Sequence, residues 1–122
     1  MAAKRKVAFP RRGEVYLVNF DPTVGAEIRK TRPALIVQND TGNRFSDTTI
    51  IAAMSSRTGA KLYPTEVPVA PPEGGLSKPS VLLLDQVRTI DRGRLQRRLG
   101  RLAPTTMDRV NRALRISLDL LD

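Results

Sequence analysis

The side chains of this sequence that are suited to chemistry are basic or carry hydroxyl groups. The sequence contains 21 Lys and Arg residues and 12 Asp and Glu residues, but no histidine and no cysteine. A thiolate nucleophile, a disulfide, a thiolate metal site and a pair of catalytic histidines are therefore excluded. An enzyme with this composition must use Arg, Lys, carboxylates, hydroxyls or backbone groups.

One short segment concentrates such groups. Residues 22–33 (PTVGAEIRKTRP) place Glu27, Arg29, Lys30 and Arg32 between two prolines, and a loop with this much charge is a candidate functional loop. The guanidinium group of Arg donates planar pairs of hydrogen bonds to phosphate. Together with a formal net charge of +9, the segment predicts binding to nucleic acid or another polyanion.

The acidic residues are scattered along the chain without the paired spacing of a metal-dependent nuclease site. We therefore expect neither a metal ion nor any other cofactor. No apolar run approaches the roughly 18 residues that a membrane-spanning helix needs, and the N-terminus lacks the apolar core of a signal peptide. The expected location is the cytoplasm, without membrane contacts.

The elements that must position these groups are mostly short strands. Alternating or continuous apolar runs predict strands at 14–20, 34–38, 48–56, 65–69 and 80–87. The strand 80–87 is the most apolar and is expected inside the sheet, whereas Pro68 suits an edge strand. Loops or turns are expected at 22–33, 39–47, 57–64 and 70–79.

Two helices are expected after the strands. Asp91 is a candidate cap for a short helix over 92–100, which Gly100 would end. Pro104 fits the first turn of a C-terminal helix. The apolar stripe of that helix would consist of Met107, Val110, Leu114, Ser117/Leu118 and Leu121. Strands first and helices late predict an α+β fold with an antiparallel sheet and a small, partly closed barrel.

Five segments follow one another in a recognisable order: RRGEVYLVNFDPTVGAE (11–27), KTRPALIVQND (30–40), SVLLLDQVRTID (80–91), RLGRL (98–102) and ALRISLDL (113–120). Together they resemble the MazF/PemK family of toxin endoribonucleases over nearly the whole chain. The resemblance implies an SH3-like, partly open antiparallel β-barrel with accessory helices, including a C-terminal helix, as in CcdB and PemK proteins. Residues 11–122 would form this single domain, and residues 1–10 a basic tail.

The resemblance also implies an activity and its partners. The protein would be a sequence-specific, metal-independent endoribonuclease toxin that acts on single-stranded RNA. The 2′-hydroxyl of the RNA would attack the adjacent phosphorus and leave a 2′,3′-cyclic phosphate and a 5′-hydroxyl. The toxin would be a homodimer with a groove at its interface, and a MazE-like antitoxin, acidic and largely disordered, would compete for that groove.

Three residues are the candidate catalytic groups. Arg32 matches the family's catalytic arginine, and would stabilise charge on the phosphate or donate a proton through a strained charge pair. Base action does not suit a guanidinium group, which holds its proton far above neutral pH. Ser55 stands where the family usually carries a catalytic Thr; Ser56 is adjacent, but strand alternation lets only one of the two face the groove. Glu27 would orient Arg32 or accept a hydrogen bond from a base amine.

Other residues are expected to contact RNA without reacting. They are Arg29, Lys30, Ser56, Arg57, Lys61, Gln86 and Arg88. Of these, Arg29 and Lys30 would track phosphates, and Gln86 either contacts RNA or satisfies nearby backbone groups. Tyr63 either stacks on a base or packs, and the arginines between 88 and 101 either line the groove or form a solvated face.

Two other functions fit the same fold and charge, because a fold does not fix a function. One is a non-enzymatic protein that poisons gyrase, as CcdB does, and the other is a non-catalytic nucleic-acid-binding module. The segment with Arg32 and the hydroxyl at position 55 favour RNA cleavage.

Overall fold

The computed structural model describes residues 9–20, 31–56 and 61–120. Within these residues, six strands form one sheet whose paired strands all run antiparallel. The strands are β1 (Glu14–Asn19), β2 (Thr31–Ile36), β3 (Thr48–Ser55), β4 (Glu66–Val69), β5 (Ser80–Asp91) and β6 (Leu95–Arg101). The helical elements are α1 (Asp40–Phe45), the 3₁₀ turns η1 (Glu73–Gly75) and η2 (Arg92–Arg94), and α2 (Pro104–Ser117).

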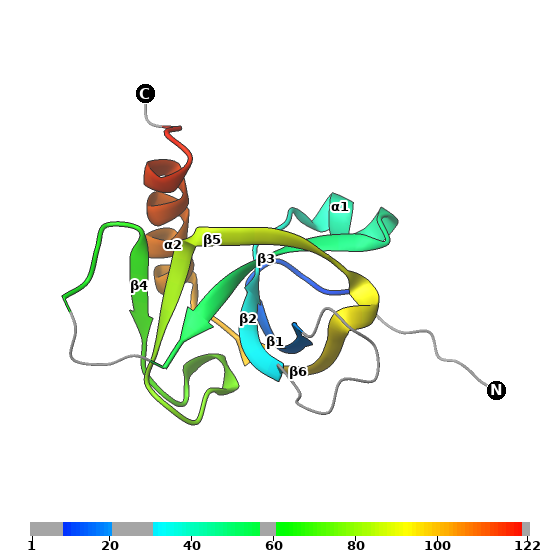
Figure 1. Cartoon of the computed structure of the whole chain (residues 1–122), viewed down its shortest axis with the longest axis horizontal. Helices are drawn as coiled ribbons and strands as arrows, with labels where there is room; N and C mark the ends of the chain where they lie inside the picture. The colour runs from blue at the N-terminus through cyan, green and yellow to red at the C-terminus, as the bar shows by residue number, and fades with distance from the viewer. Residues whose placement is uncertain (1–8, 21–30, 57–60, 121–122) are drawn as a thin grey trace.

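The sheet is bent into a partly open barrel (Figure 1). Its strand order is β4-β5-β3-β2-β1-β6, so β4 and β6 are the edges and do not pair with each other. The long strand β5 arches over its neighbours, and η2 turns the chain back into β6. Pro68 lies in the edge strand β4, and β5 lies inside the sheet, as expected. The predicted fold class is confirmed.

The core consists of two clusters on opposite faces of β2. Leu35 belongs to the first cluster, whereas Ala34 and Ile36 belong to the second, because successive side chains of a strand point to opposite faces. All three are fully buried. The helix α2 packs on the first cluster through Val110 and Ala113. Full burial stabilises a large aliphatic side chain by roughly 1.5–3 kcal/mol, so both faces hold β2 in place.

The helix α2 begins at Pro104, as predicted, and Met107 and Leu114 pack against the first cluster. The predicted apolar stripe does not continue to Leu118, because Leu118 follows the last residue of the helix and is 55% exposed. Leu121 lies outside the described residues. Among the described helices, none has the length and apolar character needed to span a membrane.

The helix predicted over 92–100 is wrong. The chain forms η2 there and then β6, which pairs with β1. Leu95 and Leu99 are four residues apart, a spacing typical of one helix face, but they pack against different clusters. The edge of β1 supplies hydrogen-bond partners to β6, and Gly93 disfavours a helix there by about 1 kcal/mol relative to Ala.

Other predicted boundaries also shift. The range 39–47, expected as a turn, contains α1, whose first turn is capped because the Asn39 side-chain oxygen accepts a hydrogen bond from the Gly42 N–H at 2.7 Å. The last residues of the range expected as a loop at 22–33 belong to β2, and β5 continues beyond 87 to Asp91.

The turn η1 holds the loop before β5 close against β6. Gly75 has a φ of +73°, and a Cβ built on it would lie 2.0 Å from the backbone oxygen of Leu99. A Cβ on Gly100, across the contact, would lie 2.7 Å from the carbonyl carbon of Gly74. The two backbones therefore touch where no side chain fits, and this contact fixes the loop relative to β6.

We expect Gly75→Ala to lower the free energy of unfolding by at least about 1–3 kcal/mol, the cost of a strained backbone conformation, before the clash with Leu99 is added. Urea unfolding measures the loss. Gly93→Ala is the matched control, since a Cβ there would meet nothing within 4 Å. Equal losses in both variants would contradict the close contact between η1 and β6.

Candidate active site

The pairing of β2 with β3 brings the two main candidate catalytic residues together. Ala34 pairs with Ala53, and Ile36 with Ile51. Arg32 and Ser55 each lie two residues beyond the Ala34–Ala53 pair, at the same end of the two strands. Residues two apart in a strand share a face, so Arg32 and Ser55 lie on the face that carries the second cluster.

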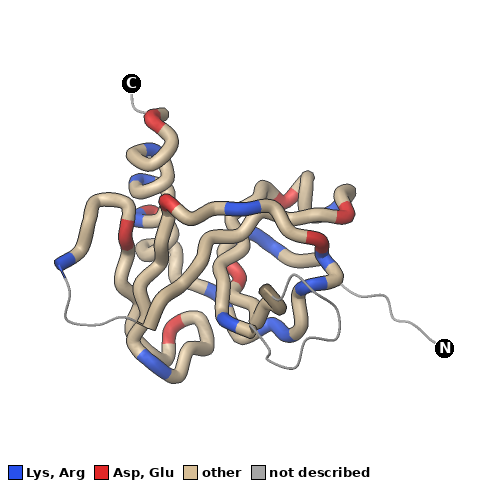
Figure 2. Tube along the Cα trace, viewed as in Figure 1, with Lys and Arg blue, Asp and Glu red and all other residues tan. Residues whose placement is uncertain are grey.

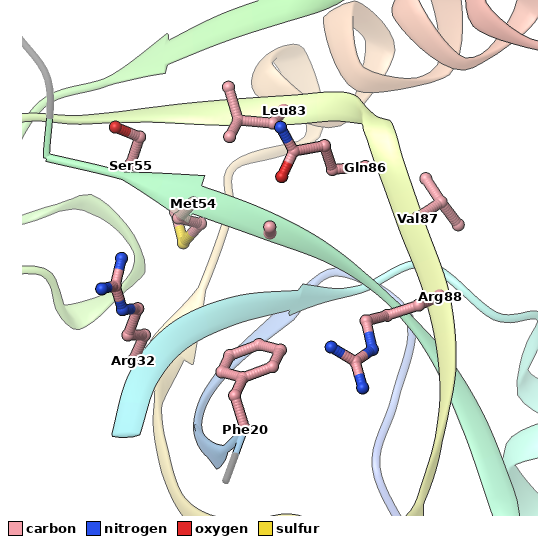
Figure 3. A pocket seen from close by; sticks show the side chains of 9 residues that line it. Phe20, Arg32, Met54, Ser55, Leu83, Gln86, Val87 and Arg88 are labelled. Atoms are coloured by element: carbon pink, nitrogen blue, oxygen red, sulfur yellow. The ribbon is translucent and has the colours of Figure 1, made fainter. Parts of the chain in front are cut away.

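A pocket of about 620 Å³, here called the first hollow, opens beside this pair (Figure 3). Its lining residues are Phe20, Arg32, Ala53, Met54, Ser55, Leu83, Gln86, Val87 and Arg88. Arg32 rises from the end of β2 toward β3, and Gln86 extends from β5 above β3. Two cations, an amide and a hydroxyl thus border a largely apolar floor, an arrangement that suits a base and its phosphate.

An irregularity in β5 places Gln86 in the first hollow. Ala52 pairs with Val87, but the next residue of β3, Ala53, pairs with Leu83. Leu84, Asp85 and Gln86 therefore have no partners on β3, and β5 bends at this bulge (Figure 3). Bulges redirect side chains: Leu84 is fully buried, whereas Gln86 is exposed and lines the hollow. This position favours the RNA-contacting alternative for Gln86.

Phe20 is a site residue that the sequence reasoning missed. The Arg88 guanidinium lies over its ring, 5.4 Å from the ring centroid, and both residues line the first hollow. A guanidinium in this position is attracted by the ring electrons. An aromatic residue immediately before Asp21-Pro22, where a strand ends, was the available signal. Arg88, which was predicted to contact RNA, lines the first hollow together with Gln86.

A second pocket, here called the second hollow, has a volume of about 570 Å³. Arg32, Met54 and Ser55 line both hollows, so these three residues form the wall between them. The other residues that line the second hollow are Leu17, Pro33, Ser56, Gly75, Leu76, Ser77, Lys78, Ser80, Arg97 and Leu99. Ser56 lines only the second hollow, whereas Ser55 lines both hollows.

The arginines between 88 and 101 divide into different roles. Arg92 and Arg94 donate hydrogen bonds to the backbone oxygens of Ser46 and Asn19, and Arg98 forms an ion pair with Glu14, N···O 2.7 Å. Figure 2 shows that basic residues recur along β6. In this run Arg88 and Arg97 line the hollows, so neither of the two predicted alternatives holds for all of these arginines.

The remaining predicted residues are less informative. Lys61 and Tyr63 are exposed and line neither hollow. Glu27, Arg29, Lys30 and Arg57 lie outside the described residues, so their roles stay predictions.

All charged residues that line the two hollows in the described part of the chain are basic. No carboxylate lines either hollow among the described residues, and these residues contain no cluster of three or more acidic groups that could hold a metal ion. Burial, followed by the neighbouring Glu14 carboxylate, raises the pKa of Tyr16. Tyr16 lines neither hollow, so this shift concerns packing rather than chemistry.

The family model of PemK-like, MazF-like toxins of type II toxin–antitoxin systems matches residues 11–118. The chain belongs to this family. The MazF-like toxin is 44% identical to endoribonuclease EndoA of Bacillus subtilis over 112 residues, which cover 92% of the chain and 97% of EndoA. It is also 44% identical to endoribonuclease MazF of Staphylococcus saprophyticus over 110 residues, covering 90% and 92% of the two chains.

The fold of the MazF-like toxin is similar to that of a solved mycobacterial endoribonuclease in complex with its cognate antitoxin. The TM-score is 0.75 at 27% identity, and the match covers 93% of this chain and 98% of the other. Together with the family match, these relatives confirm the predicted endoribonuclease class and the toxin–antitoxin assignment. They favour a nuclease over the gyrase-binding alternative.

For this MazF-like toxin we expect Ser55→Ala to reduce the rate of RNA cleavage by about 10²-fold, the scale for losing one donor to the transition state. Ser55→Thr, which restores the residue usual in the family, should retain activity. Ser56→Ala is the matched comparison and should lose much less activity, because Ser56 lines only the second hollow. Single-turnover cleavage of one RNA substrate measures all three rates. A larger loss for Ser56→Ala than for Ser55→Ala would reverse the assignment.

Proposed function

We propose that this MazF-like toxin cleaves single-stranded RNA at specific sequences by promoting attack of the 2′-hydroxyl on the adjacent phosphorus. The observation that carries the proposal is the position of Arg32 and Ser55 on the wall shared by two hollows. A phosphate held at this wall would have one neighbouring nucleotide in the first hollow. The reaction needs no attacking water in its first step, because the nucleophile belongs to the RNA.

In this mechanism, a bond forms between the 2′-oxygen and phosphorus while the bond to the 5′-oxygen of the next nucleotide breaks. The 2′-hydroxyl gives its proton to solvent water, and solvent water gives one to the leaving 5′-oxygen, so the step consumes no proton overall. Negative charge grows on the two non-bridging oxygens, to which the Arg32 guanidinium would donate a pair of hydrogen bonds. The Ser55 hydroxyl would bind the phosphate or the 2′-hydroxyl and hold the sugar in line.

Arg32 is best suited to charge stabilisation. It is exposed, and a guanidinium offers N–H donors but no acceptor, so it does not take the proton of the 2′-hydroxyl. Stabilising charge on the phosphate requires no change in its protonation. Glu27 stays the predicted partner that orients Arg32 or binds a base.

Selectivity for sequence would come from the first hollow. The ring of Phe20 offers a stacking surface, and the Gln86 amide both donates and accepts hydrogen bonds, so it can bind the edge of an unpaired base. Arg88, above Phe20, would pair with a phosphate or stack on a base. These contacts require an unstacked strand, which explains a preference for single-stranded RNA.

The basic site also supports the proposed protein partners. An acidic, MazE-like antitoxin would compete with RNA for the groove, because carboxylates and phosphates both bind arginines. A solved relative bound to its cognate antitoxin supports this partner. A homodimer with the groove at its interface, acting in the cytoplasm, completes the proposal.

A substrate with one deoxyribose tests the mechanism. Deoxyribose at the nucleoside 5′ of the scissile phosphate should abolish cleavage in EDTA, whereas the all-ribose substrate is cut and leaves a 2′,3′-cyclic phosphate and a 5′-hydroxyl. Gel mobility and end-group analysis by mass spectrometry provide the measurement. Deoxyribose at any other position serves as the control. Cutting of the substrate that lacks the nucleophile would exclude the proposed mechanism.

Arg32→Ala should lower the cleavage rate by about 10²–10³-fold or more, as expected for a lost transition-state donor. RNA binding should weaken far less, since other cations remain. Arg109→Ala, an exposed arginine on α2 that lines neither hollow, controls for the lost charge. Binding of the deoxy substrate and cleavage of the ribose substrate separate the two effects. Wild-type cleavage by Arg32→Ala would show that the site is assigned to the wrong residue.

A further inference from the structure

The second hollow contains two cations to which the proposed mechanism gives no role. Lys78, in the loop before β5, and Arg97, on the edge strand β6, both line it together with Arg32. They come from distant parts of the chain, and both are exposed. Four serines also line this hollow, and no carboxylate does so among the described residues.

The sheet register explains how Arg97 reaches the site. Arg97 pairs with Leu17 of β1, and Leu17 pairs with Pro33 of β2. Arg97 therefore stands two strands away from Pro33, the neighbour of Arg32, and all four residues line the second hollow. Leu17 and Pro33 form an apolar floor with Arg97 at one end, and Arg32, the residue before Pro33 in β2, also lines the hollow.

The close contact between η1 and β6 places Lys78 at the same hollow. Gly75 lines the hollow and lies against the backbone at Leu99, so the chain returns to β5 along the same hollow that Arg97 lines. Ser80 then donates a hydrogen bond to the backbone oxygen of Lys78 at 3.1 Å. The backbone of the loop at Lys78 is thus fixed, while its ammonium group extends from an exposed position.

Lys78 and Arg97 also differ from the neighbouring arginines in their contacts. Arg92, Arg94 and Arg98 each bind a backbone oxygen or a carboxylate. The side chains of Lys78 and Arg97 form no hydrogen bond or ion pair with any described residue. Cations that no carboxylate neutralises, over an apolar floor, suit a phosphate and its sugar or base.

We infer that the second hollow binds the nucleotide on the opposite side of the scissile phosphate from the first hollow, and that Lys78 and Arg97 neutralise its phosphate. This inference rests on the proposed function for the place of the scissile phosphate at Arg32 and Ser55. The RNA strand is then held on both sides of the bond that breaks. Such positioning limits rotation of the reacting sugar and phosphate and favours in-line attack.

The test uses a double variant, Lys78→Gln with Arg97→Gln, and a matched control, Arg109→Gln with Arg112→Gln on the exposed face of α2. Each removes two positive charges from exposed positions. The probe is single-stranded RNA of mixed sequence, and binding is measured by fluorescence anisotropy at several salt concentrations. The first variant should bind about tenfold more weakly, and its slope of log affinity against log salt should be smaller by about 0.7 for each phosphate lost.

The control variant should keep a slope and an affinity near wild type. Lys78→Arg with Arg97→Lys should restore most of the binding, because both charges remain. Circular dichroism confirms that all variants fold. Equal losses in the test and control variants would overturn the inference, since the effect would then be general electrostatic attraction.

Truncated RNAs then locate the contact. An oligonucleotide centred on a mapped cut site, with deoxyribose at the scissile position, is shortened from one end or from the other. The difference between wild type and the Lys78, Arg97 variant should vanish for truncation at one end only, and persistence with both truncations would overturn the inference. Binding to mixed-sequence RNA does not depend on cleavage. A negative result for RNA binding in the second hollow can therefore be distinguished from a negative result for the cleavage mechanism.

Discussion

The change of register between β3 and β5 is the constraint on which the site depends. Before it, Ala52 pairs with Val87, and after it Ala53 pairs with Leu83. The unmatched residues let one strand serve two purposes. Its first half pairs with the edge strand β4, and its second half carries Ile90 over the second cluster. The bulge between the halves turns Gln86 away from the core and opens the first hollow, bounded below by the small side chain of Ala53. A regular β5 would keep strict alternation through this segment and could not place Gln86, Val87 and Arg88 around one hollow.

The basic residues behind the net charge of +9 serve two different purposes, the fold and the site. Arg12 donates hydrogen bonds to the Val37 oxygen and to the Asn111 side chain, and thereby joins the sheet to α2. Arg98 binds Glu14 across β6 and β1. Both arginines therefore stabilise the fold, and the Glu14 carboxylate neutralises the charge of Arg98. Arg32, Lys78 and Arg97 instead border a hollow whose described lining contains no carboxylate, and such a hollow attracts an anion such as phosphate.

The site residues that could be predicted from the sequence lie in or near short motifs of neighbouring residues. Arg32 was predicted from a segment that resembles the family, and Ser55 from the position where the family usually carries a Thr; the pairing of β2 with β3 brings both to the same two hollows. The strand β6 was predicted as a helix because Asp91 and Gly100 suit the two ends of a helix, whereas the pairing with β1 that makes it a strand is a contact between distant segments. Lys78 joins the site through a glycine contact between distant backbones. Such tertiary contacts leave no periodic signal in the sequence.

The openness of the site links selectivity to catalysis. Arg32 is exposed in the free protein, where water screens its charge and a bound phosphate would gain little from it. RNA that fills both hollows would cover the wall between them and displace that water, which strengthens the interaction of Arg32 with the phosphate oxygens. A strand whose bases do not fit the first hollow would leave the wall hydrated. Binding energy from nucleotides that do not react is then used to stabilise the transition state at the one that does. On this view the hollows on either side of Arg32 are as much a part of the catalytic apparatus as Arg32 itself.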